Sequence, residues 1–161
     1  DRLEAVYGVI GKIKPFGAKS AGRLQKYRIK DNFLNFWFRF VYKNRPAIET
    51  GNFKYIKEVT QREFSTYSGV ILERLFHELV AETLEYNRIG NYWEKGNSNE
   101  IDLIGVNEMK KKMLLAEIKL NPKKIDIGTL KRKSEKLISR YKDYQIEYKG
   151  LSVRNIAEYL K

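Results

Sequence analysis

Two short apolar segments that carry carboxylates limit most strongly what this chain can fold into. They cover residues 100–104 and 114–120, and in both of them charged side chains are interspersed at every second position. A period of two places successive side chains on opposite faces of a β-strand. We therefore expect two strands, joined as a hairpin through the lysine-rich turn at residues 107–112.

The predicted hairpin brings acidic side chains and one ammonium group onto a shared patch. Glu100 and Asp102 lie on one face of the first strand, and Glu117 and Lys119 lie on one face of the second. Their apolar neighbours indicate a largely buried strand pair, where ionisable groups are costly unless they are paired or bind a metal. The pattern by itself leaves two interpretations open, a surface salt bridge and a metal site.

The metal interpretation predicts chemistry on a phosphate ester. Mg²⁺ prefers carboxylate oxygens and keeps several waters, and a bound divalent ion activates water and neutralises phosphate charge. We expect Asp102 and Glu117 to hold Mg²⁺ or Mn²⁺, with Glu73 adding a third oxygen. Lys119 would orient the attacking water or offset charge on the pentavalent phosphate, and Glu100 would be a further ligand or a hydrogen-bond acceptor.

An apolar stripe with a period of 3.6 residues predicts a helix over residues 68–86. Glu73 and His77 share one side of it, because they lie four residues apart. His77 has two interpretations, a general base near the metal and a packed side chain; packing is the commoner case, so we leave it out of the expected site. A second helix is expected at about 125–141, and a last strand at about 145–153.

The chain carries a large excess of positive charge. Its 161 residues have a formal net charge of +12, which folding does not require. The excess is concentrated in residues 1–60 and on the second predicted helix, and it indicates a polyanionic partner, nucleic acid rather than membrane. A solvated helix face is the other interpretation of that helix. The side chains expected to contact nucleic acid are Lys123, Lys124, Lys131, Arg132, Lys133 and Lys136.

Composition excludes several classes of site and partner. The chain has no Cys and one His, which excludes disulfides, thiolate metal sites and a His-rich zinc site. No apolar run approaches the ~20 residues of a membrane-spanning helix, so we expect no membrane partner and a cytoplasmic location. Because the chain opens at Asp1 within an expected structural element, we also expect it to be the C-terminal piece of a longer protein.

The first part of the chain predicts a basic hairpin and an aromatic helix. Residues 9–13 and 26–29 form the hairpin, interpreted as the wing of a winged-helix domain or as an ordinary surface hairpin. Asp31 caps a helix over residues 32–42, which must be buried on several sides or covered by a partner. Core packing is favoured there over a base-stacking surface. Residues 46–63 are expected to form a loop and a charged segment at a domain boundary.

Asp102, the Glu117-Ile118-Lys119 segment and the helix residue Glu73 together resemble the PD-(D/E)xK nuclease superfamily. Ile101 stands where that motif has its name-giving proline. The order helix, three strands, helix, strand is also similar to the core of that family, over about residues 64–155. The resemblance implies an α/β fold with a restriction-endonuclease-like α-β-β-β-α-β core, and a metal-dependent endonuclease, a hydrolase acting on ester bonds.

A second resemblance concerns the N-terminal part. Residues 27–41, followed by Asn44-Arg45 and residues 48–51, look like the C-terminal region of prokaryotic and archaeal-type P-loop ATPases that carry a domain of unknown function, type 234, after a winged helix. This implies an upstream ATPase module as a partner. The motif G-x-x-x-x-G-K-S/T does not occur, so no ATP site is expected in this fragment. The expected domains are a winged-helix wing remnant at 1–30, an aromatic helix and linker at 31–63, and a nuclease-like domain at 64–161.

Three functions are compatible with these patterns. The first is metal-dependent hydrolysis of nucleic acid, with DNA as the expected substrate, under the control of the ATPase. The second is a catalytically inactive nuclease-fold module that binds DNA or docks to the ATPase. The third is a protein-interaction domain whose aromatic helix packs on the ATPase. The presence together of Glu73, Asp102, Glu117 and Lys119 favours the first.

Overall fold

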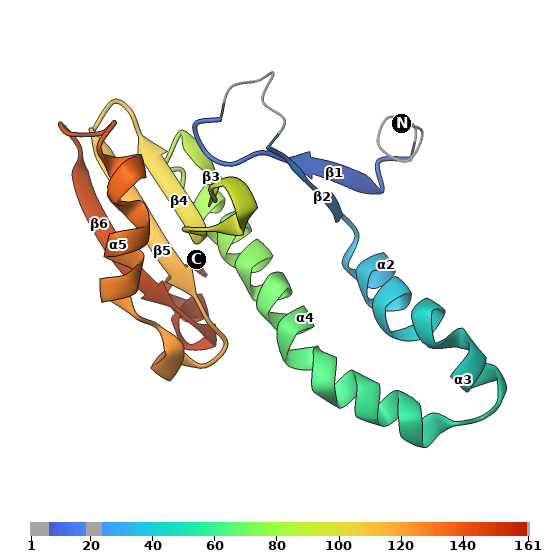
Figure 1. Cartoon of the computed structure of the whole chain (residues 1–161). Coiled ribbons are helices and arrows are strands. Elements are labelled where there is room, and N and C mark those ends of the chain that lie inside the picture. The colour runs from blue at the N-terminus through green and yellow to red at the C-terminus, as the bar shows by residue number, and fades with distance from the viewer. Residues whose placement is uncertain (1–6, 19–23, 161) are drawn as a thin grey trace. The chain divides into compact units, whose positions relative to one another are not determined.

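A computed structural model of the chain describes residues 7–18 and 24–160 (Figure 1). The structure is of mixed α/β type, and it divides into two compact units. Among the described residues, the first unit contains 7–13 and 25–71, and the second contains 14–18, Leu24 and 72–160. In the described part of the chain, every helix is too short or too polar to cross a lipid bilayer.

The first unit begins with the predicted hairpin. Strands β1 (Ile10–Ile13) and β2 (Lys26–Ile29) pair antiparallel, with Ile10 opposite Ile29. This confirms both strands, whereas their interpretation as the wing of a winged helix stays a prediction. Residues 1–6 and 19–23 of the expected wing remnant lie outside the described residues.

The aromatic segment is helical, as predicted, but it is only half buried. Asp31 caps α2 (Asn32–Phe36) by accepting a hydrogen bond from the backbone N–H of Leu34 at 2.7 Å. A π-helical turn over Trp37–Val41 and a 3₁₀ turn over Tyr42–Asn44 follow, and α3 (Arg45–Glu49) ends the segment. Phe40 is buried against the ring of Tyr67. Other large aromatic side chains of the segment are exposed, with the largest exposed fractions at Phe33, Trp37, Phe38 and Tyr42.

The expected loop at residues 46–63 is wrong, because α4 (Phe53–Glu82) already begins within it. The charged sequence of the early part of α4 contains neither Gly nor Pro, so nothing in it opposes a helix. Val59 is buried there, and Glu63 pairs with Arg39 at 3.1 Å, which connects α4 to the aromatic segment. Contacts that are distant in sequence therefore stabilise the early part of α4, which precedes the apolar stripe of the predicted helix.

The second unit contains a four-stranded mixed sheet in the order β3-β4-β5-β6. The predicted hairpin of β4 (Ile101–Asn107) and β5 (Lys112–Ile118) is confirmed, with Leu103 opposite Ala116. Strand β3 (Arg88–Tyr92) pairs antiparallel with β4. Helix α5 (Ile127–Ile138) leads to β6 (Gln145–Leu151), which pairs parallel with β5, and a 3₁₀ turn over Val153–Glu158 follows.

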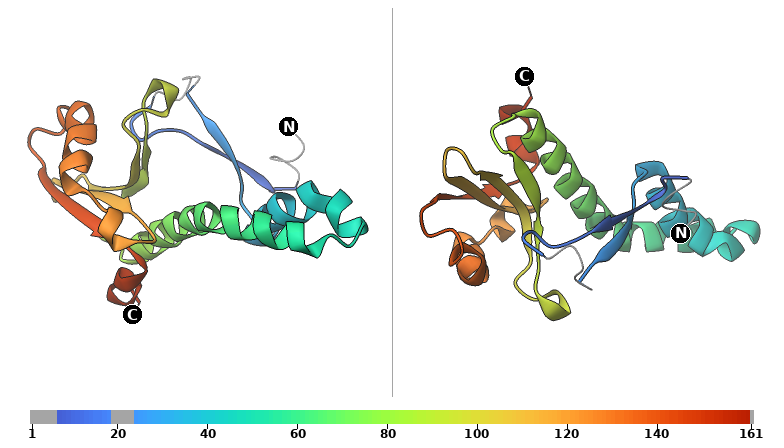
Figure 2. Two further views of the ribbon diagram at one scale, coloured as in Figure 1. Left: turned by 60° about the horizontal axis from the view of Figure 1, so that its bottom comes forward. Right: turned by 90° about the horizontal axis from the view of Figure 1, so that it is seen from above.

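The two faces of this sheet are covered by different helices (Figure 2). Leu130 and Leu137 of α5 pack on one face together with Ile104 and Leu115. The last turns of α4 cover the other face, where Phe76 packs in a separate cluster. The alternation along β5 assigns Met113 and Leu115 to the α5 side, and Leu114, Ala116 and Ile118 to the α4 side. The same alternation along β5 places the side chain of Glu117 on the sheet face that α5 covers.

Candidate functional site

The two central carboxylates project from neighbouring strands at one end of the sheet. Leu103 and Ala116 are the last registered pair of β4 and β5, so Asp102 and Glu117 follow as the next cross-strand neighbours. Their side chains are only 12% and 10% exposed. The alternation of strand residues therefore places two nearly buried carboxylates together, as the sequence predicts.

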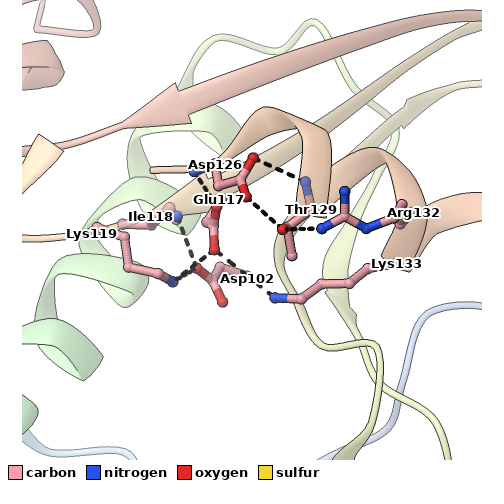
Figure 3. A network of polar contacts seen from close by, with 8 residues as sticks. All are labelled: Asp102, Glu117, Ile118, Lys119, Asp126, Thr129, Arg132 and Lys133. Atoms are coloured by element: carbon pink, nitrogen blue, oxygen red, sulfur yellow. Dashed lines mark hydrogen bonds and ion pairs between the residues drawn. The ribbon is translucent and has the colours of Figure 1, made fainter. Parts of the chain in front are cut away.

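One lysine lies between these carboxylates (Figure 3). The Lys119 ammonium is 2.8 Å from Oδ2 of Asp102 and 3.5 Å from Oε1 of Glu117. Oδ2 of Asp102 also accepts a hydrogen bond from the backbone N–H of Ile118 at 2.8 Å. Lys119 is the first residue after β5, which allows its side chain to turn back over the end of the strand pair.

The charge of Lys119 is stabilised by its acidic neighbours. Burial by itself lowers the pKa of Lys119, but the hydrogen bond and charge of Asp102 and the charges of Glu117 and Glu73 outweigh that effect. The pKa of Lys119 is therefore raised above its ordinary value. At neutral pH its ammonium is fully protonated, so it acts as a fixed positive charge and a hydrogen-bond donor.

The beginning of α5 holds Glu117 from the other side. Oε2 of Glu117 accepts a hydrogen bond from the backbone N–H of Asp126 at 3.0 Å, and Lys133 Nζ lies 3.9 Å from Oε1. Asp126 is the N-cap of α5; its carboxylate accepts hydrogen bonds from Thr129, and these lower the pKa of Asp126. Arg132 in turn donates to Thr129 Oγ1 at 2.6 Å.

Sequence reasoning missed Asp126 and Thr129 as part of this network. The signal was present, because an Asp directly before an amphipathic helical pattern is typical of a helix N-cap. The contact from Asp126 to Glu117 had no such signal, because it depends on how the segment after β5 returns over the sheet.

His77 contacts the backbone of the site strand. Its Nε2 lies 2.8 Å from the carbonyl oxygen of Asp102, which also accepts a hydrogen bond from Asn91 Nδ2 at 2.7 Å. A carbonyl only accepts, so Nε2 of His77 carries the hydrogen. The pairing of β3 with β4 shifts register between Gly90 and Tyr92, which frees the Asp102 carbonyl for these two side chains. The structure thus gives His77 a supporting polar contact.

The predicted third carboxylate is near the pair, but it does not complete a metal cluster. Glu73 is close enough for its charge to raise the pKa of Lys119. Glu100 is exposed and precedes β4. Within residues 7–18 and 24–160, no group of three or more His, Asp or Glu side chains is placed to hold a metal ion. The metal-ligand roles of Asp102, Glu117 and Glu73 stay predictions.

The donor set of the pair nevertheless suits a hard divalent cation. Mg²⁺ commonly binds proteins through one or two carboxylates and keeps waters in its other positions. Asp102 and Glu117 supply two such groups, each anchored by a backbone N–H through one oxygen. Those hydrogen bonds fix both carboxylates, so a cation that displaces the Lys119 ammonium would meet oxygens that are already oriented.

The six predicted nucleic-acid contacts do not share one surface. Lys123 and Lys124 lie in a 3₁₀ turn over Pro122–Lys124, between β5 and α5. On α5, Lys133 points toward Glu117, and Lys136 pairs with Glu94 at 2.9 Å. Lys131 instead lies 5.4 Å above the ring of Tyr148 on β6. Helical spacing places Arg132, Lys133 and Lys136 on one side of α5 and Lys131 on another.

Comparisons with known proteins place this chain in a family. The sequence profile of a family described as archaeal and bacterial proteins of unknown function matches residues 37–138. An uncharacterised protein from Methanocaldococcus jannaschii is 38% identical over 101 residues, which cover 58% of this chain and 22% of that protein. The chain thus spans about a fifth of the length of this curated relative. No solved structure matches. The family match includes Glu73, Asp102, Glu117 and Lys119, and the chain belongs to the DUF234 family.

Proposed function

We propose that the second unit catalyses metal-dependent hydrolysis of phosphodiester bonds in nucleic acid, with DNA as the expected substrate. The observation that carries the proposal is the pair of nearly buried carboxylates, Asp102 and Glu117, that share the Lys119 ammonium at one end of a sheet. The order α4, β3, β4, β5, α5, β6 supports a restriction-endonuclease-like core. The net charge of +12 supports a polyanionic substrate.

Asp102 and Glu117 would hold Mg²⁺ or Mn²⁺, with Glu73 as the expected third ligand. A bound divalent ion supplies Lewis-acid stabilisation of the phosphate and a more acidic water. Lys119 would donate hydrogen bonds to the attacking water or to a phosphate oxygen; its acidic neighbours raise its pKa, which favours the protonated form. Lys133, beside Glu117, adds positive charge where the phosphate becomes more negative.

A second candidate function is a catalytically inactive module for DNA binding or docking. The observation in its favour is that the two carboxylates already have internal partners. Asp102 accepts from Ile118 and Lys119, and Glu117 accepts from Asp126. Such a network stabilises the sheet end without any metal, so salt-dependent binding would persist when Asp102 is replaced.

An ATPase module is a proposed partner in both cases. The M. jannaschii relative extends well beyond the matched 22% of its length, so a protein of this kind has room for further domains. The exposed aromatic side chains Phe33, Trp37 and Tyr42 offer apolar surface for contact with another part of such a protein.

The direct test measures cleavage of labelled single-stranded, duplex and branched DNA by this chain with Mg²⁺, Mn²⁺ or EDTA. We expect cleavage that requires the metal and that falls about 100-fold or more in Lys119→Met and Glu117→Gln. Lys111→Met is the matched control, because Lys111 is an exposed lysine that pairs with Asp143, away from the site. Salt-dependent binding of DNA without cleavage under any metal would favour the inactive module instead.

Metal binding is tested separately from cleavage. A crystal soaked in Mn²⁺ should show anomalous density between Asp102 and Glu117, and titration calorimetry should show the binding lost in Asp102→Asn. Normal Mn²⁺ binding by Asp102→Asn would contradict the assignment of this residue as a ligand.

A further inference from the structure

A cavity of about 340 Å³ lies near the C-terminal end of α5 in the second unit. Its lining comes from residues 15–18 and Leu24, from residues 92–95 at the end of β3, and from two cations of α5 and the turn after it, Lys136 and Arg140. The Arg140 guanidinium also borders Gly17, where a Cβ would lie 3.8 Å from Nη1. The cavity is thus built by three segments that are far apart in the sequence.

The lining is positively charged. Lys95, Lys136 and Arg140 contribute three cations, and Glu94 contributes one carboxylate. Hydrogen bonds from Lys136 and Asn99 lower the pKa of Glu94, which is therefore ionised at neutral pH. Glu94 also accepts a hydrogen bond from the Tyr92 hydroxyl at 3.0 Å. Glu94 orients Lys136 but does not cancel the excess of positive charge in the cavity, because two further cations line it. The Lys136 ammonium also has three donors, so its bond to Glu94 leaves donors for a ligand.

The cavity lies on the same side of α5 as the carboxylate site. Lys133 and Lys136 lie three residues apart, which places them on one side of α5, and Arg140 lies in the turn that follows the helix. Lys133 Nζ is 3.9 Å from Glu117. The helical rise of about 1.5 Å per residue separates Lys133 from Lys136 by about 4.5 Å along α5, and Arg140 lies beyond the end of the helix.

We propose that this cavity is a second phosphate-binding site, which holds a backbone phosphate of the nucleic acid a short distance along the strand from the carboxylate site. The side of α5 that carries Lys133 and Lys136, with Arg140 beyond it, then determines the path of the bound strand, and Lys131, over Tyr148 on another side of α5, does not contact it. The proposal rests on the proposed function for the class of ligand. It adds the position and direction of the strand.

Basic residues near a helix C-terminus also interact favourably with the helix dipole. That effect accounts for positive charge at Lys136 and Arg140, but not for Lys95, which lies outside α5 and lines the same cavity. A helix that is only stabilised through its dipole would need neither a cavity nor a third cation outside the helix. Both features therefore favour a phosphate site.

The test compares two double variants that remove equal charge. Lys136→Gln/Arg140→Gln removes two cations of the cavity, and Lys131→Gln/Lys142→Gln removes two exposed lysines that do not line it. Binding of a fluorescent DNA oligonucleotide is measured by anisotropy over a range of KCl concentrations. We expect the first variant to reduce the slope of log K against log salt by about one unit, the contribution of about one phosphate contact, and the second to leave it unchanged.

A second measurement locates the phosphate. In a series of oligonucleotides, one backbone phosphate at a time is replaced by a neutral methylphosphonate. The wild-type protein should bind one oligonucleotide of the series more weakly than the others. The cavity variant should bind that oligonucleotide as tightly as the unmodified strand. Lys95→Gln/Arg140→Gln, which leaves the pair of Lys136 and Glu94 intact, gives the same readout if the first variant unfolds.

The outcomes separate this inference from the proposed function. If the cavity and control variants change the salt dependence of DNA binding equally, the second site is overturned. If the wild type still cleaves DNA with metal in that case, the proposed function remains in place. A specific effect of the cavity variant without cleavage supports the site and overturns catalysis. A wild-type protein that binds no nucleic acid at low salt overturns both.

Discussion

The ammonium of Lys119 lies 2.8 Å from Oδ2 of Asp102, and both groups sit at the end of a sheet where Glu117 is also nearly buried. Two carboxylates of low exposure would repel each other strongly without a cation between them. The lysine thus stabilises the folded site and also defines its chemistry.

Replacing Lys119 by Met should destabilise the protein. Removing one partner of a buried ion pair costs about 3–5 kcal/mol, but Lys119 is 34% exposed, so we expect about 1–2 kcal/mol. Urea denaturation at pH 7 measures the loss. Lys111→Met, which removes an exposed pair with Asp143, should change the free energy of unfolding by less than about 0.5 kcal/mol; equal losses would show that the Lys119 contact has no special role.

The raised pKa of Lys119 predicts a loss of stability in alkali. A lysine whose pKa is higher in the folded state stabilises that state fully below the unfolded pKa of about 10.5, and this contribution disappears as the pH rises through the folded pKa. The wild-type protein should therefore lose more stability above pH 10.5 than Lys119→Met does. Urea midpoints of both proteins between pH 9 and 12 give the comparison, and parallel curves would exclude the effect.

The N-cap of α5 should support the site. Asp126→Ala removes the acceptor for Thr129 and should lower the melting temperature, whereas Asp126→Asn keeps a capping oxygen and should lower it less. Because the pKa of Asp126 is lowered by folding, its stabilising charge is present above the unfolded pKa and disappears as the pH falls through the folded pKa. Melting curves at pH 7 and pH 3 should therefore show a smaller acid effect in Asp126→Asn than in the wild type.

Gly150 should be intolerant of a side chain. A Cβ at this position of β6 would collide with Cγ2 of Ile125, the residue before Asp126. Gly150→Ala should cost about 1–3 kcal/mol by overpacking, and it should weaken the hydrogen bond from Asp126 to Glu117 by displacing the segment. Gly69→Ala in α4 is the control, because the space around it is open and a helical Ala should stabilise by about 0.5–1 kcal/mol. Both values are measured by urea denaturation.

The aromatic segment should have one buried side and one side that this chain does not need for folding. Phe40 is 2% exposed and Phe33 is 67% exposed. Phe40→Ala should therefore cost about 3–5 kcal/mol, and Phe33→Ala less than about 0.5 kcal/mol. Guanidinium denaturation checks both values, and a large cost for Phe33→Ala would mean that its ring is buried in solution.

How much of the fold follows from the sequence depends on the range of the interactions involved. The hairpin of β4 and β5 was predictable, because a period of two along Ile101–Ile104 and Leu114–Ile118 already assigns one face of each strand to the core. The helix over 53–67 was not, because its stability comes from contacts such as Arg39 with Glu63 across 24 residues. Local patterns show which residues are buried, but not what buries them.

The site divides in the same way. The sequence by itself determined that Asp102, Glu117 and Lys119 lie together, because strand alternation and a short turn leave few other arrangements. Only the tertiary structure decided that His77 and Asn91 hold the Asp102 carbonyl, that Asp126 holds Glu117, and that Lys136 turns toward Glu94 while Lys131 covers Tyr148. The physical reason is that helix and strand periods fix the direction of a side chain on its own element, whereas its partner depends on how that element packs against others.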